Sequence, residues 1–156
     1  MDRLDSANVR FPPPLIYLLA LLLGVFGGRA LGVSQLGIDS NVRNLIAFAF
    51  GLSGSILMLS GARLFLRYGT AVIPHKPANR LVITGIYHWT RNPMYLGMAL
   101  LYSGLAIMFD SLLALLVLPV VLIVIQTQVI AREEAYLERT FGDDYIAYRN
   151  RVRRWI

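Results

Sequence analysis

The sequence predicts an all-α fold: a polytopic membrane protein with four transmembrane helices, an interfacial loop between helices 2 and 3, and a C-terminal amphipathic helical segment. Hydrophobic residues make up 56% of the 156 residues and charged residues only 15%, whereas about a quarter of the residues are charged in an ordinary soluble domain. In addition, four stretches contain no Asp, Glu, Lys or Arg: residues 11–28, 44–62, 92–109 and 111–131. Each is close to the roughly 20 residues that a helix needs to cross a bilayer.

The first two stretches have the features of packed membrane helices. Prolines from Pro12 to Pro14 open the first stretch, and proline suits a first helical turn because the amide that it lacks would have no partner there. The second stretch carries Ala47, Gly51 and Ser55 at a spacing of four. Small residues at this spacing predict a face on which another helix can approach closely.

The third and fourth stretches are separated by a single charged residue, Asp110. Asp110 and Ser111 can accept hydrogen bonds from the exposed amides of the next helix, which predicts a tight helical hairpin. Farther along, Leu137 and Phe141 continue a helical spacing of apolar residues, so the fourth helix should extend out of the membrane as an amphipathic helix. Gly142 should end this helix, and a second short helix should fold back against it.

Positive charges are concentrated on one side of the predicted bundle. Only Arg29 and Arg43 fall on the other side, in the connection between the first two helices. By the positive-inside rule, both termini and the long middle loop are cytoplasmic, and Asp110 is at the outer surface. We therefore expect an integral protein of an inner or cytoplasmic membrane, in which the formal charge of +6 reflects orientation and no nucleic acid is a partner.

The composition also excludes several kinds of site. The chain has no cysteine, which removes disulfides, thiolate metal ligands and cysteine nucleophiles. Its two histidines, His75 and His88, are not adjacent to acidic clusters, so we expect no metal site. No repeat or linker divides the chain, and a single domain of residues 1–156 is predicted.

The segment GIYHWTRNPMYLG, residues 85–97, places polar and aromatic side chains directly before an apolar helix. The rings of Tyr87 and Trp89 are expected at the membrane interface, as in an aromatic belt. A belt does not require the Arg91-Asn92-Pro93 turn that follows. In the C-terminal segment, Glu133 shares a helical face with apolar residues and is the carboxylate expected to point inward, although an exposed acidic face is an equal alternative.

Residues 68–156 resemble the catalytic half of the isoprenylcysteine carboxyl methyltransferase and phospholipid methyltransferase superfamily, whose members are small integral membrane enzymes that use S-adenosylmethionine. The resemblance rests on motifs in a fixed order. They are Thr70 to Pro77, Gly85-Ile86-Tyr87, Arg91-Asn92-Pro93-Met94-Tyr95-Leu96-Gly97, Glu133-Glu134 with Leu137, and Phe141-Gly142-Asp143-Asp144-Tyr145 followed by Tyr148. It divides the domain into two N-terminal spans, residues 1–66, and a cofactor-binding half, residues 67–156.

The resemblance implies a site for S-adenosylmethionine, and for its product S-adenosylhomocysteine, at the cytoplasmic ends of helices 3 and 4. The candidate cofactor-binding residues are Tyr87, His88, Arg91, Asn92, Tyr95, Gly97, Glu133, Glu134 and Tyr136. The candidate catalytic residues are Arg91, Arg132 and Glu133. Asn92 stands where the family has a histidine and cannot titrate, which puts a proton-accepting role there in doubt. His88, one turn earlier, is the alternative.

The chemistry of the side chains agrees with this resemblance. Arginine can clamp the carboxylate of the cofactor, glutamate can pair with its ammonium, and tyrosine rings can face its cationic sulfur. A carboxylate acceptor needs a nearby cation, Arg91 or Arg132, whereas an amine acceptor needs an acidic neighbour that takes its proton.

We therefore expect methyl transfer to the carboxylate or another nucleophile of a lipophilic small molecule or lipid-anchored substrate among the membrane lipids. The alternatives are a phospholipid or amine N-methyltransferase, a non-enzymatic small membrane protein, and a membrane reductase that uses a nicotinamide cofactor. The sequence predicts no oligomeric state.

Overall fold

The structure, a computed structural model, describes residues 11–33, 35–70 and 79–156. Its elements in chain order are α1 (Pro13–Ala30), α2 (Ser40–Arg67), the 3-10 turn η1 (Gly85–His88), α3 (Pro93–Met108), α4 (Leu112–Ile125), the π-helical turn η2 (Gln126–Ile130), α5 (Ala131–Phe141) and α6 (Asp143–Arg151). No strand occurs in these described ranges. The predicted all-α class is confirmed, with α1 beginning within the proline run.

Within the described part of the chain, three helices are long and apolar enough to cross a membrane: α1, α2 and the continuous helix Leu112–Phe141. The fourth apolar helix, α3, has 16 residues. At 1.5 Å per residue it is about 24 Å long, which is shorter than the roughly 30 Å of a hydrocarbon core. The chain is an integral membrane protein with these three candidate spans and one shorter apolar helix.

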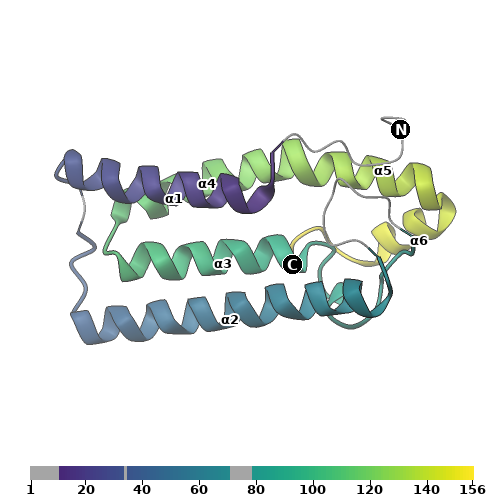
Figure 1. Cartoon of the computed structure of the whole chain (residues 1–156), viewed down its shortest axis with the longest axis horizontal. Coiled ribbons are helices and arrows are strands. Elements are labelled where there is room, and N and C mark those ends of the chain that lie inside the picture. The colour runs from purple at the N-terminus through teal and green to yellow at the C-terminus, as the bar shows by residue number, and fades with distance from the viewer. Residues whose placement is uncertain (1–10, 34, 71–78) are drawn as a thin grey trace.

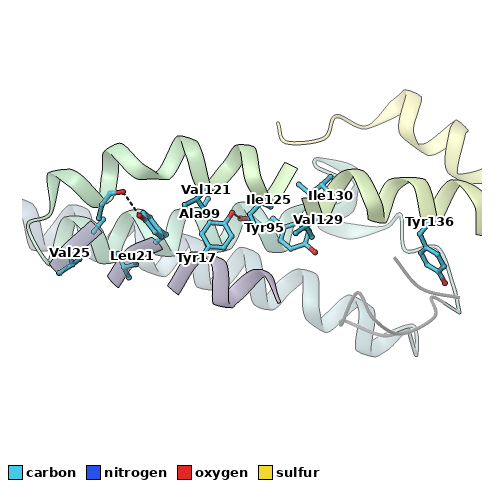
Figure 2. Close-up of a cluster of buried hydrophobic side chains, with 13 residues drawn as sticks. Tyr17, Leu21, Val25, Tyr95, Ala99, Val121, Ile125, Val129, Ile130 and Tyr136 are labelled. Carbon is cyan, nitrogen blue, oxygen red and sulfur yellow. Dashed lines mark hydrogen bonds between the residues drawn. The ribbon is translucent and has the colours of Figure 1, made fainter. Parts of the chain in front are cut away.

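The helices form an elongated bundle. In Figure 1, α1 runs beside α4, and α3 lies between this pair and α2. The main apolar cluster joins α1, α3 and α4 through Tyr17, Leu21, Ala99, Val121 and Ile125, as Figure 2 shows. The bundle therefore has its core around α3, and α5 and α6 extend beyond one end (Figure 1).

Helices α2 and α3 are in contact through their backbones. A Cβ atom on Gly97 would lie 2.7 Å from the carbonyl oxygen of Gly54, and one on Gly104 would lie 2.8 Å from that of Ala47. Only glycine allows this separation, as in other closely packed membrane helices. Of the small residues predicted on this face, Ala47 and Gly51 lie at the contact with α3, together with Gly54.

The hairpin between α3 and α4 forms as predicted, but only one of its two polar residues is a cap. Ser111 Oγ accepts a hydrogen bond from the Ala114 amide at 3.2 Å. The prediction for Asp110 was wrong. This residue has a φ of 54°, and its carboxylate accepts from the Leu36 amide at 2.9 Å and pairs with Arg43 at 3.0 Å. Asp110 thus ties the α1–α2 connection to the hairpin.

The C-terminal segment follows the prediction closely. The helix continues through η2 into α5, and Gly142, with a φ of 53°, separates α5 from α6. Tyr145 and Tyr148 of α6 pack against Leu137 and Phe141. Residues 152–156, which we call the C-terminal strap, then return to the start of α3 (Figure 1).

The predicted interfacial loop between helices 2 and 3 is described only in part. Residues 71–78, which include His75 and nearly all of the Thr70–Pro77 motif, lie outside the described residues. From residue 79 onward the loop passes through η1 and reaches α3.

Candidate functional site

The C-terminal strap is hydrogen-bonded to the turn that precedes α3. The Arg91 amide donates to the Arg153 carbonyl at 3.0 Å. The Arg154 carbonyl accepts from Asn92 Nδ2 at 2.9 Å and from Thr90 Oγ1 at 3.2 Å. Asn92 is buried, and its side chain holds the strap in place as a hydrogen-bond donor.

Two arginines share the carboxylate of Glu134. Arg91 Nη1 lies 3.1 Å from Glu134 Oε1, and these two side chains are only 10% and 12% exposed. Arg154 forms a bidentate pair, with Nε at 3.0 Å from Oε1 and Nη2 at 2.6 Å from Oε2. Arg91 Nη1 also donates to Tyr145 Oη at 3.4 Å. The Nε of Arg91 is buried and has no partner in the described part of the structure.

Glu133 has a different environment. Its Oε1 accepts a hydrogen bond from Tyr95 Oη at 2.5 Å. Tyr17 of α1 donates to the Tyr95 carbonyl at 3.2 Å, and Figure 2 labels both residues. Across the described ranges no arginine forms an ion pair with Glu133. Both glutamates, not Glu133 alone, therefore point inward.

We call Arg91, Tyr95, Glu133, Glu134 and Arg154 the polar cluster. It lies where α3 and α5 begin and where the C-terminal strap crosses them. Its cations gather around one carboxylate, while the other carboxylate is bonded to a tyrosine. Such a division of charge is complementary to a small zwitterion, whose anionic group needs a donor and whose cationic group needs an acceptor.

Tyr87 is buried, so the expectation that its ring lies at the membrane interface is wrong. The ring stacks on Phe65 with 5.2 Å between centroids, and its hydroxyl has no partner within the described residues. Burial raises the pKa of Tyr87, and the neighbouring Tyr148 and Glu133 raise this pKa further. The hydroxyl is therefore a proton donor at neutral pH. Trp89, by contrast, is 80% exposed.

The structure does not bring every predicted residue into the polar cluster. His88 is exposed at the end of η1, and Gly97 faces α2, where its lack of a side chain allows the helices to approach. Arg132 Nη2 donates to Gln128 Oε1, four residues earlier on the same helix, at 3.3 Å. Tyr136 is buried in the main apolar cluster, away from Tyr95 in Figure 2.

Sequence reasoning did not identify three features of the site. Arg154 lies in a basic tail whose arginines have no distinguishing spacing, and Tyr17 lies in a helix without a motif. The π-helical turn Gln126–Ile130 precedes both glutamates, and Trp155 Nε1 of the strap donates to Gln126 Oε1 at 2.9 Å. A π turn rotates the side chains that follow it relative to a regular α-helix, and such turns are frequent at functional sites.

Comparison with known proteins identifies the family. The sequence matches the family described as phospholipid methyltransferase over residues 42–144, which is most of the chain. A curated protein of Haemophilus influenzae, described only as an uncharacterized protein, is 41% identical over 63 residues, or 40% of this chain and all of that protein. No solved structure matches the chain. The chain therefore belongs to the phospholipid methyltransferase family, within the superfamily that its motifs resemble, and this membership indicates methyl transfer to a membrane substrate.

Proposed function

We propose that this protein is an S-adenosylmethionine-dependent methyltransferase whose site is the polar cluster, and that its acceptor is an amine-bearing lipid. One observation carries the proposal. Two arginines and two glutamates meet on a mostly apolar bundle, and two buried polar atoms beside them, Arg91 Nε and Tyr87 Oη, have no partner within the described residues. A buried donor without a partner costs about 1–3 kcal/mol. A ligand that accepts from these atoms would remove this cost.

The residues of the polar cluster fit the cofactor. S-adenosylmethionine, when bound, supplies a methyl group activated by a positively charged sulfur. Arg91 can hold a carboxylate through its unpartnered Nε, and Glu133 can hold an ammonium because no described arginine neutralises it. The oxygens of Tyr87 and Tyr95 can face a cation.

The same charges favour an amine acceptor. A carboxylate acceptor would need a further cation, because Arg91 is assigned to the carboxylate of the cofactor and Arg132 donates to Gln128. An amine acceptor needs no such cation, because a neutral amine attacks the methyl group through its own lone pair. The family description, phospholipid methyltransferase, supports a lipid acceptor. The second candidate, a lipophilic carboxylate, would require a cation other than Arg91, which is assigned to the cofactor.

The contribution of the chain is alignment and exclusion of water, which are the main requirements of an in-line displacement. Tyr95 fixes the Glu133 carboxylate, and Tyr17 fixes the backbone of Tyr95. Asn92 holds the C-terminal strap across the start of α3. We infer that the strap shields the site from water while an acceptor reaches it from the bilayer.

We also propose that α3 is a fourth membrane span and that the polar cluster is cytoplasmic. Most of the described arginines lie at the end of the bundle that carries the cluster, and Arg29 and Arg43 lie at the other end. The positive-inside rule then makes both termini cytoplasmic, in an inner or cytoplasmic membrane. A topology reporter fused after Ile156 should be active only in the cytoplasm, and activity on the other side would contradict this orientation.

The function is tested by incubating the purified protein with methyl-labelled S-adenosylmethionine and a lipid mixture that contains both amine and carboxylate acceptors. We expect label in the lipid fraction that base treatment does not convert into volatile methanol, because an N-methyl group is stable to base. Label released as volatile methanol would show a methyl ester and favour the carboxylate acceptor. No transfer and no binding of S-adenosylhomocysteine would contradict the methyltransferase, and binding of NADPH instead would favour a reductase.

A further inference from the structure

Arg154 reaches the polar cluster from the far end of the sequence. It lies on the C-terminal strap, 20 residues beyond Glu134, and its side chain is 36% exposed. Its backbone carbonyl, not its side chain, holds Asn92 and Thr90. The guanidinium therefore contacts Glu134, whereas the backbone carbonyl holds the strap. A substitution of the side chain tests the first contact and leaves the second in place.

The charges around Glu134 are unequal. Two guanidiniums face one carboxylate, and both of its oxygens are already engaged by Arg154. Arg91 still has a buried Nε without a partner in the described part of the chain. A second small anion beside the two arginines would balance the charge and accept from this donor.

We propose that Arg91 and Arg154 together form the subsite for the α-carboxylate of the cofactor's amino-acid end, and that Glu133 is left for its ammonium. The proposal rests on the proposed function and adds a specificity-determining residue to it. A guanidinium has five N–H groups. Arg154 directs those of Nε and Nη2 toward Glu134, so its other N–H groups and the Nε of Arg91 are the donors for a second carboxylate. The phosphate of a lipid headgroup is the other anion with suitable chemistry, and the experiment distinguishes the two.

The test is calorimetric titration of the detergent-solubilised protein, without added lipid, with two ligands. S-adenosylhomocysteine has the amino-acid end, and 5′-methylthioadenosine lacks it. We expect Arg154→Ala to weaken binding of the first ligand about tenfold to a hundredfold, the usual range for a charge-assisted contact, and to leave binding of the second unchanged. Arg154→Lys, which keeps the charge without the planar fork, should fall between.

Arg151→Ala is the matched control. Arg151 is an exposed arginine at the end of α6 whose Nε donates to the Ala147 carbonyl at 3.2 Å. Its loss should change neither affinity. Circular dichroism and size-exclusion chromatography check that each variant is folded, and Arg154→Gln serves as the second variant if Arg154→Ala does not fold.

Three outcomes would overturn the assignment. Equal weakening of both ligands by Arg154→Ala would show a purely structural role. Unchanged affinity for both would exclude the cofactor carboxylate as the anion that Arg154 binds. If the parent protein bound neither ligand, the proposed function would fail and the subsite with it, whereas the first two outcomes leave the proposed function standing.

Discussion

Two arginine–carboxylate pairs lie at opposite ends of the bundle and have nearly the same geometry. Arg43 and Asp110 are 3.0 Å apart, and Arg91 and Glu134 are 3.1 Å apart. In both pairs the arginine Nε is buried without a partner among the described residues. Neither the distance nor the unpartnered nitrogen therefore distinguishes a functional site from a structural contact.

The surroundings of the two pairs distinguish them. Asp110 contacts one arginine, Arg43 of α2, and the backbone amide of Leu36 in the α1–α2 connection. One positive charge therefore faces one negative charge there. Glu134 has two arginines, and Glu133 with its tyrosine stands beside it. Only the second arrangement leaves separate positive and negative groups for a ligand.

The largest expected effect is that of Arg91→Ala. The substitution removes a buried cation that contacts Glu134 and Tyr145, and loss of such a contact is worth about 1.5–3 kcal/mol. Affinity for S-adenosylhomocysteine should fall about tenfold to a hundredfold in calorimetric titration. Arg91→Lys should recover only part of it because lysine lacks the planar fork. If the folded Arg91→Ala protein bound this ligand as tightly as the parent does, the Arg91–Glu134 pair would be a structural contact like the Arg43–Asp110 pair.

Gly97→Ala should damage the fold and not the site. The added Cβ would lie 2.7 Å from backbone atoms of α2, and overpacking of this kind costs about 1–3 kcal/mol. The thermal midpoint should fall, while affinity for S-adenosylhomocysteine below this midpoint stays as in the parent. An unchanged midpoint with weakened binding would mean that Gly97 contacts the ligand directly.

Tyr95→Phe should affect methyl transfer more than stability. The hydroxyl that fixes Glu133 is lost, while the ring that packs in the core is kept. We expect the rate of transfer at saturating cofactor to fall about tenfold, which corresponds to roughly 1.4 kcal/mol. A rate equal to that of the parent would show that Glu133 needs no support from Tyr95.

Asp110→Asn, at the opposite end, should have the smallest effect. It removes the charge that pairs with Arg43 and keeps an oxygen for the Leu36 amide. Ion pairs of partly exposed side chains contribute about 0.2–1 kcal/mol, so the thermal midpoint should fall slightly. Cofactor affinity should not change, and a loss comparable to that of Arg91→Ala would show that the ends are coupled.

The helices could be predicted because their causes are local. Charge-free stretches give the apolar helices, Ser111 caps α4 and Gly142 separates α5 from α6. The helix α2 nevertheless extends past the apolar stretch 44–62 to Ser40–Arg67, because charged residues can continue a helix into water. Hydrophobicity therefore predicts which part of a helix lies in the membrane, but it does not predict the residue at which the helix ends.

Only the residues of the candidate site that belong to sequence motifs could be predicted. Arg91, Tyr95 and the two glutamates belong to motifs, whereas Arg154 is one of several arginines in a tail without a pattern. Its contact with Glu134 depends on how α6 folds back. The sequence prediction placed Tyr87 at the membrane interface, but its ring stacks on Phe65 inside the protein. An aromatic residue beside polar residues gives the same sequence pattern in both environments.

The central claim is that the polar cluster binds the methyl donor through separate positive and negative groups. The most direct measurement is titration of S-adenosylhomocysteine into the parent protein and into Glu133→Gln, which removes the one cluster carboxylate without a described arginine partner. We predict saturable binding of one ligand per chain in the parent and binding weakened about tenfold or more in Glu133→Gln. Equal affinity of the two folded proteins for this ligand would contradict the account.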